Sequence, residues 1–305
     1  MTIALISHLD CRLHDMGSGH PESPLRLDAI NDHLISLRLD PMLERLDAPL
    51  ATREQLARVH ASHYIDTVYS TSPEHGLAEL DPDTWMNKHT LNAALRAAGA
   101  VVLGVDRVMA GMNHVAFCSV RPPGHHAERH RAMGFCLFNN VAVGAAHALH
   151  AHGLERVAIV DFDVHHGNGT EHIFMDEPAM MFCSTFQSPF YPHSSTAPLP
   201  AHIVNVPLPA GTGSNEYRAA VSEKILSVLE DFRPQLVMFS AGFDGHLEDP
   251  LANFRLVEAD YRWITAQVRE IAETHANGRI VSTLEGGYAL HALGRSVAAH
   301  LQALI

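Results

Sequence analysis

A short segment near the middle of the chain leads from a buried-type strand directly into metal-ligating side chains. Residues 157–169 read VAIVDFDVHHGNG, and the opening Val-Ala-Ile-Val is typical of a strand that is buried on both faces. Alternate side chains of an extended backbone share a face, so we expect Asp161, Asp163 and His165 to point the same way. Solvated acids rarely follow such an apolar run. The pattern therefore predicts a metal site at the end of a strand.

Three further apolar runs also end in residues that could do chemistry. One run leads into a Pro-Gly turn that carries His125 and His126. A second run is followed by Asp244, and a third by Tyr288. Each of these features could be structural when taken alone. Because the C-terminal ends of parallel strands gather at one edge of a sheet, their joint occurrence predicts that they converge in one site.

Apolar, β-branched runs alternate with helix-like segments along the chain. The runs expected to be strands are residues 3–7, 115–120, 157–161, 180–184, 236–240 and 280–284. The segments expected to be helices are residues 24–37, 90–109, 140–151, 216–229 and 259–272. This alternation predicts an α/β fold with a central, mostly parallel sheet and helices on both faces. Residues 187–213 carry six prolines and are expected to form a long ordered loop.

Composition and charge limit the partners that the chain could bind. No linker or internal repeat is visible, so we expect residues 1–305 to form a single domain. The net charge of -13 repels phosphate backbones, so we expect no direct nucleic-acid contact, whereas a cationic substrate is compatible. The apolar stretch 97–105 is far shorter than the ~20 residues that span a bilayer, so no membrane association is expected. Four widely spaced cysteines favour reduced thiols and a cytoplasmic location. The oligomeric state stays open.

Six motifs together resemble one enzyme family. They are GHPESPLR at 19–26, RPPGHHA at 121–127, GFCLFNNVA at 134–142, DFDVHHGNGT at 161–170, SAGFD at 240–244 and EGGY at 285–288. In this order they resemble the zinc-dependent histone deacetylase family. The sequences RPPGHHA and DFDVHHGNGT are similar to those of the class II branch and of bacterial deacetylase-like amidohydrolases. The resemblance implies the arginase/deacetylase fold, a single α/β domain with its active site at the strand ends.

The resemblance also implies which residues hold metal ions. The zinc ligands of the family fall on Asp163, His165 and Asp244. Two carboxylates and one imidazole leave coordination positions open for water and substrate, which is typical of a catalytic rather than a structural zinc. A potassium ion is expected near Asp161, Asp163, His165 and Ser184.

Catalytic roles are carried over in the same way. The resemblance assigns proton transfer to the pair His125 and His126, and support of the oxyanion to the hydroxyl of Tyr288. The first histidine is expected to pair with Asp161 and the second with Asn168. Class I members of the family have an aspartate at the last of these positions, so this chain departs from that branch.

Accessory positions follow from the resemblance as well. Phe135 and Tyr191 are expected to form the walls of a narrow apolar tunnel for a four-carbon, lysine-like stem. Gly134 would let its backbone approach the substrate, and Arg26 would line an internal path for acetate release. Because the alignment across the proline-rich loop could slip by one residue, Phe190 remains an alternative to Tyr191 as the tunnel wall.

The function implied is that of a zinc-dependent amidohydrolase which removes acetyl groups from Nε-acetyl-lysine or a similar cationic amine, on a small molecule or a peptide. An acetylpolyamine deacetylase is the alternative within the same chemistry. In a polyamine-selective branch a glutamate follows the Asp-Pro downstream of the last zinc ligand, whereas Leu251 stands here, which favours lysine. A binuclear manganese ureohydrolase and a non-catalytic acetyl-lysine binding module are further alternatives from other classes.

Overall fold

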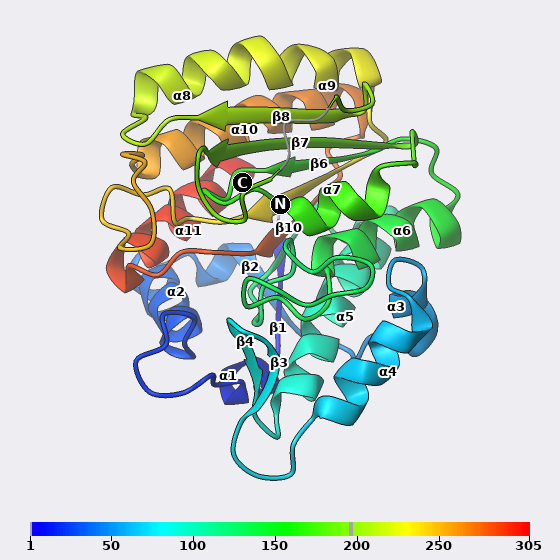
Figure 1. The fold of residues 1–305 in the computed structure, drawn as a ribbon. Helices are drawn as coiled ribbons and strands as arrows, with labels where there is room; N and C mark the ends of the chain where they lie inside the picture. The colour runs from blue at the N-terminus through cyan, green and yellow to red at the C-terminus, as the bar shows by residue number, and fades with distance from the viewer. Residues whose placement is uncertain (1, 195–197) are drawn as a thin grey trace.

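One central sheet organises the residues that the computed structural model describes, which are 2–194 and 198–305. Within them, eight strands pair in the order β2-β1-β5-β10-β9-β6-β7-β8, and every neighbouring pair is parallel (Figure 1). The strands are β1 (Ile3–Ser7), β2 (Leu43–Asp47), β5 (Val115–Cys118), β6 (Val157–Asp161), β7 (Met180–Gln187), β8 (Ile203–Leu208), β9 (Leu236–Ala241) and β10 (Ile280–Leu284). The prediction of an α/β fold with a mostly parallel sheet is confirmed.

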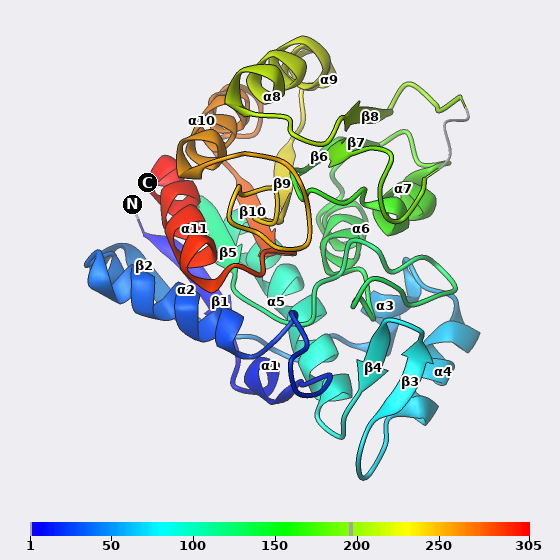
Figure 2. The ribbon, with the colours of Figure 1, turned by 60° about the vertical axis from the view of Figure 1, so that its left-hand side comes forward.

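Helices cover both faces of this sheet, as Figure 2 shows. One face carries α2 (Leu25–Ser36), α11 (Leu290–Leu304), α10 (Glu258–His275) and α8 (Ser214–Val221), while the other carries α5 (Thr90–Met109), α6 (Asn140–His152) and α7 (Asn168–Phe174). Shorter elements complete the fold: α1 (Asp10–Leu13), α3 (Arg53–Ala57), α4 (Ser62–Thr71), α9 (Ser227–Phe232), a 3₁₀ turn (Asp40–Met42), a π-helical turn (Ser222–Leu226) and the hairpin β3 (Ala78–Asp81) with β4 (Thr84–Met86). Among the described helices, none combines the length and hydropathy needed to cross a bilayer.

The proline-rich segment is one place where the prediction of secondary structure is wrong. Part of the predicted loop 187–213 is the strand β8, and residues 195–197 of that loop lie outside the described residues. A proline cannot donate a ladder hydrogen bond, so strands tolerate it mainly at the edge of a sheet. Within the described ranges β8 pairs with β7 alone, so it is such an edge strand and accommodates Pro207.

The strand order places the chemically loaded segments side by side. β6 lies between β7 and β9, and β9 lies between β6 and β10, so their C-terminal ends are adjacent along one edge of the sheet. β6 is buried along its whole length, which explains its unbroken apolar sequence up to Asp161. The loops that leave these strands therefore start from neighbouring positions along this edge.

The helices α5 and α6 pack unusually closely on their face of the sheet. A side chain at Gly144 of α6 would overlap the Val101 side chain of α5, so this approach requires a glycine. The Asn139 side chain caps α6 by accepting a hydrogen bond from the Ala142 amide at 3.0 Å. Together these contacts fix the position of α6 relative to the sheet.

A fully buried ionic cluster ties the N-terminal segment to the loop after β5. The Glu22 carboxylate accepts hydrogen bonds from Arg121 (Nη2 at 2.7 Å) and from Arg26 (Nη1 at 3.1 Å). Burial alone would raise the pKa of Glu22, but Arg121, His14 and Arg26 outweigh it and hold the pKa well below its usual range. The cluster is therefore ionised and mutually compensated in the folded protein.

We predict that Glu22→Gln lowers the free energy of unfolding by about 3–5 kcal/mol, because it leaves two buried guanidinium groups without their anion. The measurement is urea unfolding followed by circular dichroism. The depressed pKa contributes stability only while Glu22 is ionised. The difference in the free energy of unfolding between wild type and Glu22→Gln should therefore narrow as the pH falls below about 4.3. Glu273→Gln serves as a control, because the Glu273 side chain is 53% exposed and its pair with Arg269 contributes little. A Glu22→Gln protein with wild-type stability at neutral pH would contradict this view of the cluster.

Candidate active site

Three potential metal ligands meet at the C-terminal ends of β6 and β9. The loop after β6 supplies Asp163 and His165, and the loop after β9 supplies Asp244. One ligand atom from each lies within 4.8 Å of the others. The His165 Nδ1 atom is 3.2 Å from Asp163 Oδ1 and 3.1 Å from Asp244 Oδ2. The structure thus brings together the three residues that the sequence analysis selected as ligands.

The end of β10 closes over the two carboxylates through a glycine. A side chain at Gly286 would overlap the carboxylate oxygens of Asp244 and Asp163, so only glycine leaves this space open. The Gly286 amide donates to Asp163 Oδ2 at 2.8 Å, and the Val164 amide donates to Asp244 Oδ1 at 3.0 Å. These bonds fix the orientation of both carboxylates.

The electrostatics of this cluster favour a bound cation. Burial would lower the pKa of His165, but its hydrogen bonds to Asp163 and Asp244 outweigh burial and raise that pKa to about 10. Two buried carboxylates thus draw a proton onto the imidazole between them, and a metal ion would have to displace it. One nitrogen and two carboxylate oxygens suit Zn²⁺, whereas Mg²⁺ and Ca²⁺ prefer oxygen alone. The donor set therefore fits a zinc ion with open coordination positions.

The first histidine of the pair, His125, is paired with a carboxylate. His125 Nδ1 lies 2.9 Å from Asp161 Oδ2, and both residues are buried. Burial would lower the pKa of His125, but Asp161 and Asp163 outweigh it and raise the pKa to about 10. Glu285 accepts hydrogen bonds from the amides of Gly124 (2.7 Å) and His125 (3.1 Å), which positions the turn. His125 is therefore held in its charged form.

The second histidine, His126, is paired with an amide instead. Asn168 donates through Nδ2 to Glu128 Oε1 at 2.8 Å, so its Oδ1 atom must face His126 Nδ1, which lies 2.8 Å away. His126 consequently carries its proton on Nδ1 and leaves Nε2 free to accept one. Burial and the neighbouring charges of His125 and His165 keep the pKa of His126 well below its usual range. The sequence analysis missed Glu128, whose only signal was its place two residues after His126.

A cavity of about 240 Å³ opens onto this site. It is lined by Asp83, His126, Gly134, Phe135, His165, Phe190, Tyr191, Leu251 and Tyr288. Both aromatic residues of the proline-rich loop contribute to its wall. The Phe190 ring stacks on His165 at a centroid distance of 5.5 Å, while the Tyr191 ring meets His126 edge-on at 5.3 Å. Phe190 and Tyr191, which the sequence left as alternatives for the tunnel wall, therefore both line the cavity.

Tyr288 lines this cavity, and Arg26 lies against the Tyr288 ring. The Phe135 ring meets the Tyr288 ring edge-on at 6.1 Å, inside the cavity. Arg26 places its guanidinium carbon 5.1 Å from the Tyr288 ring centre and donates through Nε to the Gly287 carbonyl at 2.7 Å. Burial raises the pKa of Tyr288 well above its usual value, so its hydroxyl remains a donor at neutral pH. Arg26 is buried behind Tyr288 and does not line the cavity itself.

Two further positions complete the surroundings of the site. Asp83, in the β3–β4 turn, accepts from the Gly134 amide at 2.9 Å and from the Tyr191 hydroxyl at 3.1 Å. No sequence signal marked Asp83, because the hairpin was not predicted. Ser184 faces Asp161 across the β6–β7 pair, and its buried hydroxyl has no hydrogen-bond partner among the described residues. Such a hydroxyl is suited to a second, weakly bound cation.

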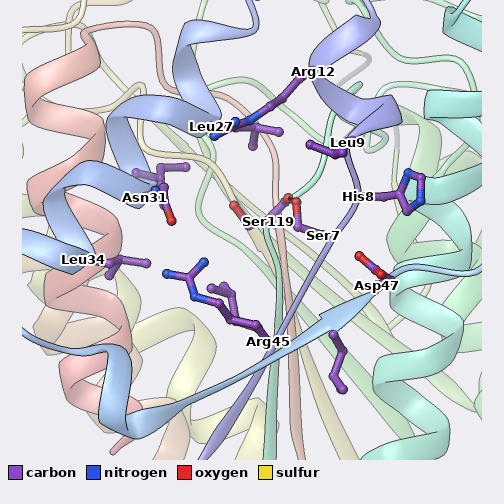
Figure 3. Close-up of a pocket in the computed structure, with 13 residues that line it drawn as sticks. Ser7, His8, Leu9, Arg12, Leu27, Asn31, Leu34, Arg45, Asp47 and Ser119 are labelled. Atoms are coloured by element: carbon purple, nitrogen blue, oxygen red, sulfur yellow. Dashed lines mark hydrogen bonds between the residues drawn. The ribbon is translucent and has the colours of Figure 1, made fainter.

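A second cavity, of about 300 Å³, shares no lining residue with the first and lies between α2 and the strands β1 and β2 (Figure 3). Its walls include the side chains of Arg12 and Arg45. Both guanidinium groups are already paired with carboxylates, at 2.5 Å to Asp28 and 2.7 Å to Asp40. Of the two cavities, the first is the one lined by a metal-ligating residue and by histidines with shifted pKa values. We therefore place the candidate active site at the first cavity.

Known proteins are similar to this chain over most or all of its length. The histone deacetylase domain matches residues 20–304. The histone deacetylase-like amidohydrolase of Pseudomonas aeruginosa is 38% identical over 278 residues, which cover 89% of this chain and 73% of that protein. The polyamine deacetylase HDAC10 of Mus musculus is 36% identical over 326 residues, which cover 100% of this chain but only 48% of that protein. The crystal structure of the HDA15 HD domain superposes with a TM-score of 0.92 at 33% identity, covering 99% of this chain and 88% of that one.

We predict that Asp244→Ala lowers the bound zinc by one ion per chain and abolishes catalysis, because the cluster loses one of its three ligands. Elemental analysis of dialysed protein measures the first effect, and an amide-hydrolysis assay measures the second. Asp231→Ala, which removes the same charge from an exposed position of α9, should change neither. Full zinc content in the Asp244→Ala protein would exclude Asp244 as a ligand.

Proposed function

Because this chain belongs to the histone deacetylase family, we propose that it is a zinc-dependent amidohydrolase which removes acetyl groups from Nε-acetyl-lysine or a similar cationic amine. One observation carries the proposal: the buried cluster of Asp163, His165 and Asp244 lies beside a histidine pair whose members have opposite protonation preferences. Pairs of titratable groups whose pKa values are driven apart are typical of acid-base catalysis. The substrate would be a small molecule or a peptide that carries an acetylated amine.

The residues around the cluster supply the remaining chemistry. Zinc held by the cluster would polarise the acetyl carbonyl and acidify a water molecule. His126 accepts a proton from the attacking water through Nε2 and later returns it to the departing amine, while Asn168 keeps the Nδ1 proton in place. The Tyr288 hydroxyl donates to the oxygen on which negative charge develops. His125, charged against Asp161, adds a fixed positive charge beside that oxygen.

The cavity walls suit the stem of an acetylated lysine. Aromatic rings from Phe135, Phe190 and Tyr191, together with Leu251, would surround a four-carbon chain and exclude water from the reacting amide. The Asp83 carboxylate and the net charge of -13 are compatible with a substrate that is cationic after deacetylation.

Accessory features belong to the same proposal. Potassium would bind near Asp161, Asp163, His165 and Ser184, where the unpartnered Ser184 hydroxyl supports it. The buried Arg26 would guide acetate away behind Tyr288. We also propose that residues 1–305 act as one catalytic domain in the cytoplasm, which accords with the four cysteines being buried free thiols.

A substrate panel tests the function and separates it from its alternatives. We expect acetyl-lysine peptides or free acetyl-lysine to have a higher kcat/KM than N-acetylated polyamines, because Leu251, which lines the cavity, stands where the resemblance places a glutamate in polyamine-selective members. Leu251→Glu should shift the preference towards polyamines, with Leu251→Gln as the uncharged control. A wild-type preference for polyamines would identify the alternative enzyme, and a zinc-loaded protein that hydrolyses no acetylated amine would overturn the proposal.

Tyr288→Phe should keep the fold and the zinc but lower kcat by about 10²–10³-fold, the usual cost of one lost oxyanion donor. Steady-state kinetics on the best substrate of the panel would measure it. If KM rises while kcat is unchanged, Tyr288 binds substrate rather than supporting the transition state, and its assigned role is wrong.

Asn168→Asp should raise the pKa of the catalytic base, because a carboxylate 2.8 Å from His126 Nδ1 favours the protonated imidazole. Protonated His126 cannot accept a proton, so the acidic limb of the kcat/KM profile should move to higher pH while zinc content stays unchanged. An unmoved limb in a folded, zinc-loaded variant would mean that Asn168 does not act on the base, or that His125 performs the proton transfer.

A further inference from the structure

We propose that Asp106, His147 and His152 form a second divalent-metal site, suited to Zn²⁺, that links α5 to α6 and is separate from the catalytic cluster. Asp106 lies in the last turns of α5, and both histidines lie in the second half of α6. Among the residues that the structure describes, this trio and the candidate active site are the two groups of three metal-ligating side chains whose ligand atoms converge within 4.8 Å.

The geometry of the trio brings two imidazoles to one carboxylate oxygen. Asp106 Oδ1 lies 2.8 Å from His147 Nε2 and 2.7 Å from His152 Nε2. The two rings are nearly perpendicular, at 79°, with their centres 5.4 Å apart. Two imidazole nitrogens and one carboxylate oxygen are a common zinc donor set, which leaves a fourth position for water.

Burial and packing make this arrangement suitable for reversible binding of an ion. His147 is buried, whereas the side chains of His152 and Asp106 are 25% and 48% exposed. An ion could therefore enter from solvent past His152 and Asp106 and reach His147, the inner ligand, which packing holds in place. The close approach of α5 and α6 at Gly144 holds the two ligand-bearing helices in register. His152 is also the last residue of α6, where the helix dipole favours a cation.

Arg58 controls the inner ligand and competes with a metal. Its Nη1 atom donates to His147 Nδ1 at 2.7 Å, so in this state the His147 proton is on Nε2, the atom that a metal would need. Metal binding therefore requires the proton to move to Nδ1 and the guanidinium to turn away. Arg58 also pairs with the largely exposed Glu54, its Nε atom has no partner among the described residues, and it lines a cavity of about 490 Å³ into which it could turn.

Because Arg58 competes with the metal, substitutions at His152 and Arg58 should change the affinity for a second zinc ion in opposite directions. ZnCl₂ is titrated calorimetrically into protein whose catalytic cluster already holds one equivalent, and bound zinc is counted by elemental analysis. Wild type should take up a second equivalent. His152→Gln, at a partly exposed position, should lose this second equivalent and keep wild-type kcat. Arg58→Gln should bind the second ion about 3- to 10-fold more tightly, since it removes a nearby like charge and its amide oxygen can accept the His147 Nδ1 proton.

The same titration separates the two metal sites. The Asp244→Ala protein should still bind one ion through the trio, whatever the catalytic cluster or the substrate proves to be. The proposal is overturned if wild type binds no zinc beyond the catalytic equivalent, if His152→Gln retains the second ion, or if Arg58→Gln binds it more weakly. Circular dichroism and thermal melting verify that each variant is folded before the titration is interpreted.

Discussion

Two aspartates buried side by side at the end of a sheet are the constraint on which the rest of this structure depends. Asp163 and Asp244 are buried on neighbouring loops, where their mutual repulsion must be offset by positive charge. Adjacent parallel strands bring them together, and Gly286 leaves room for them. The two carboxylates raise the pKa of His165, and a divalent ion held by the same residues would supply the positive charge that this cluster favours.

The histidine pair shows how neighbours assign different roles to identical side chains. His125 and His126 are adjacent in sequence, with ring centres 4.0 Å apart, yet one is held charged and the other neutral. The difference arises in their partners, since a carboxylate stabilises an imidazolium while an amide only fixes the tautomer. Glu128 completes this arrangement because it determines which end of the Asn168 amide faces the ring.

The sequence predicts the interior of the sheet well and its edges poorly. Buried parallel strands are continuous apolar runs. The bounds of β1, β6 and β10 could therefore be predicted to the residue from the run of apolar residues in the sequence. The edge strands β2 and β8 are only partly buried and carry charged residues or a proline, so they lack that signal. The ligand cluster could be predicted because strand ends converge by topology. The contacts of Asp83 and Arg58 could not be predicted. Each residue reaches its partner from a distant segment, and only tertiary packing determines where that segment lies.

The central claim is that one ion in the buried aspartate-histidine cluster enables hydrolysis of an acetylated amine. The most direct test uses the His152→Gln protein, which lacks the second metal site proposed above, strips it of metal by chelation and follows release of acetate from an acetyl-lysine substrate while ZnCl₂ is added in measured equivalents. The account predicts no turnover without metal and a rise in rate that is complete at one equivalent per chain. Turnover by the metal-free protein, or a rate that requires two equivalents to appear, would contradict it.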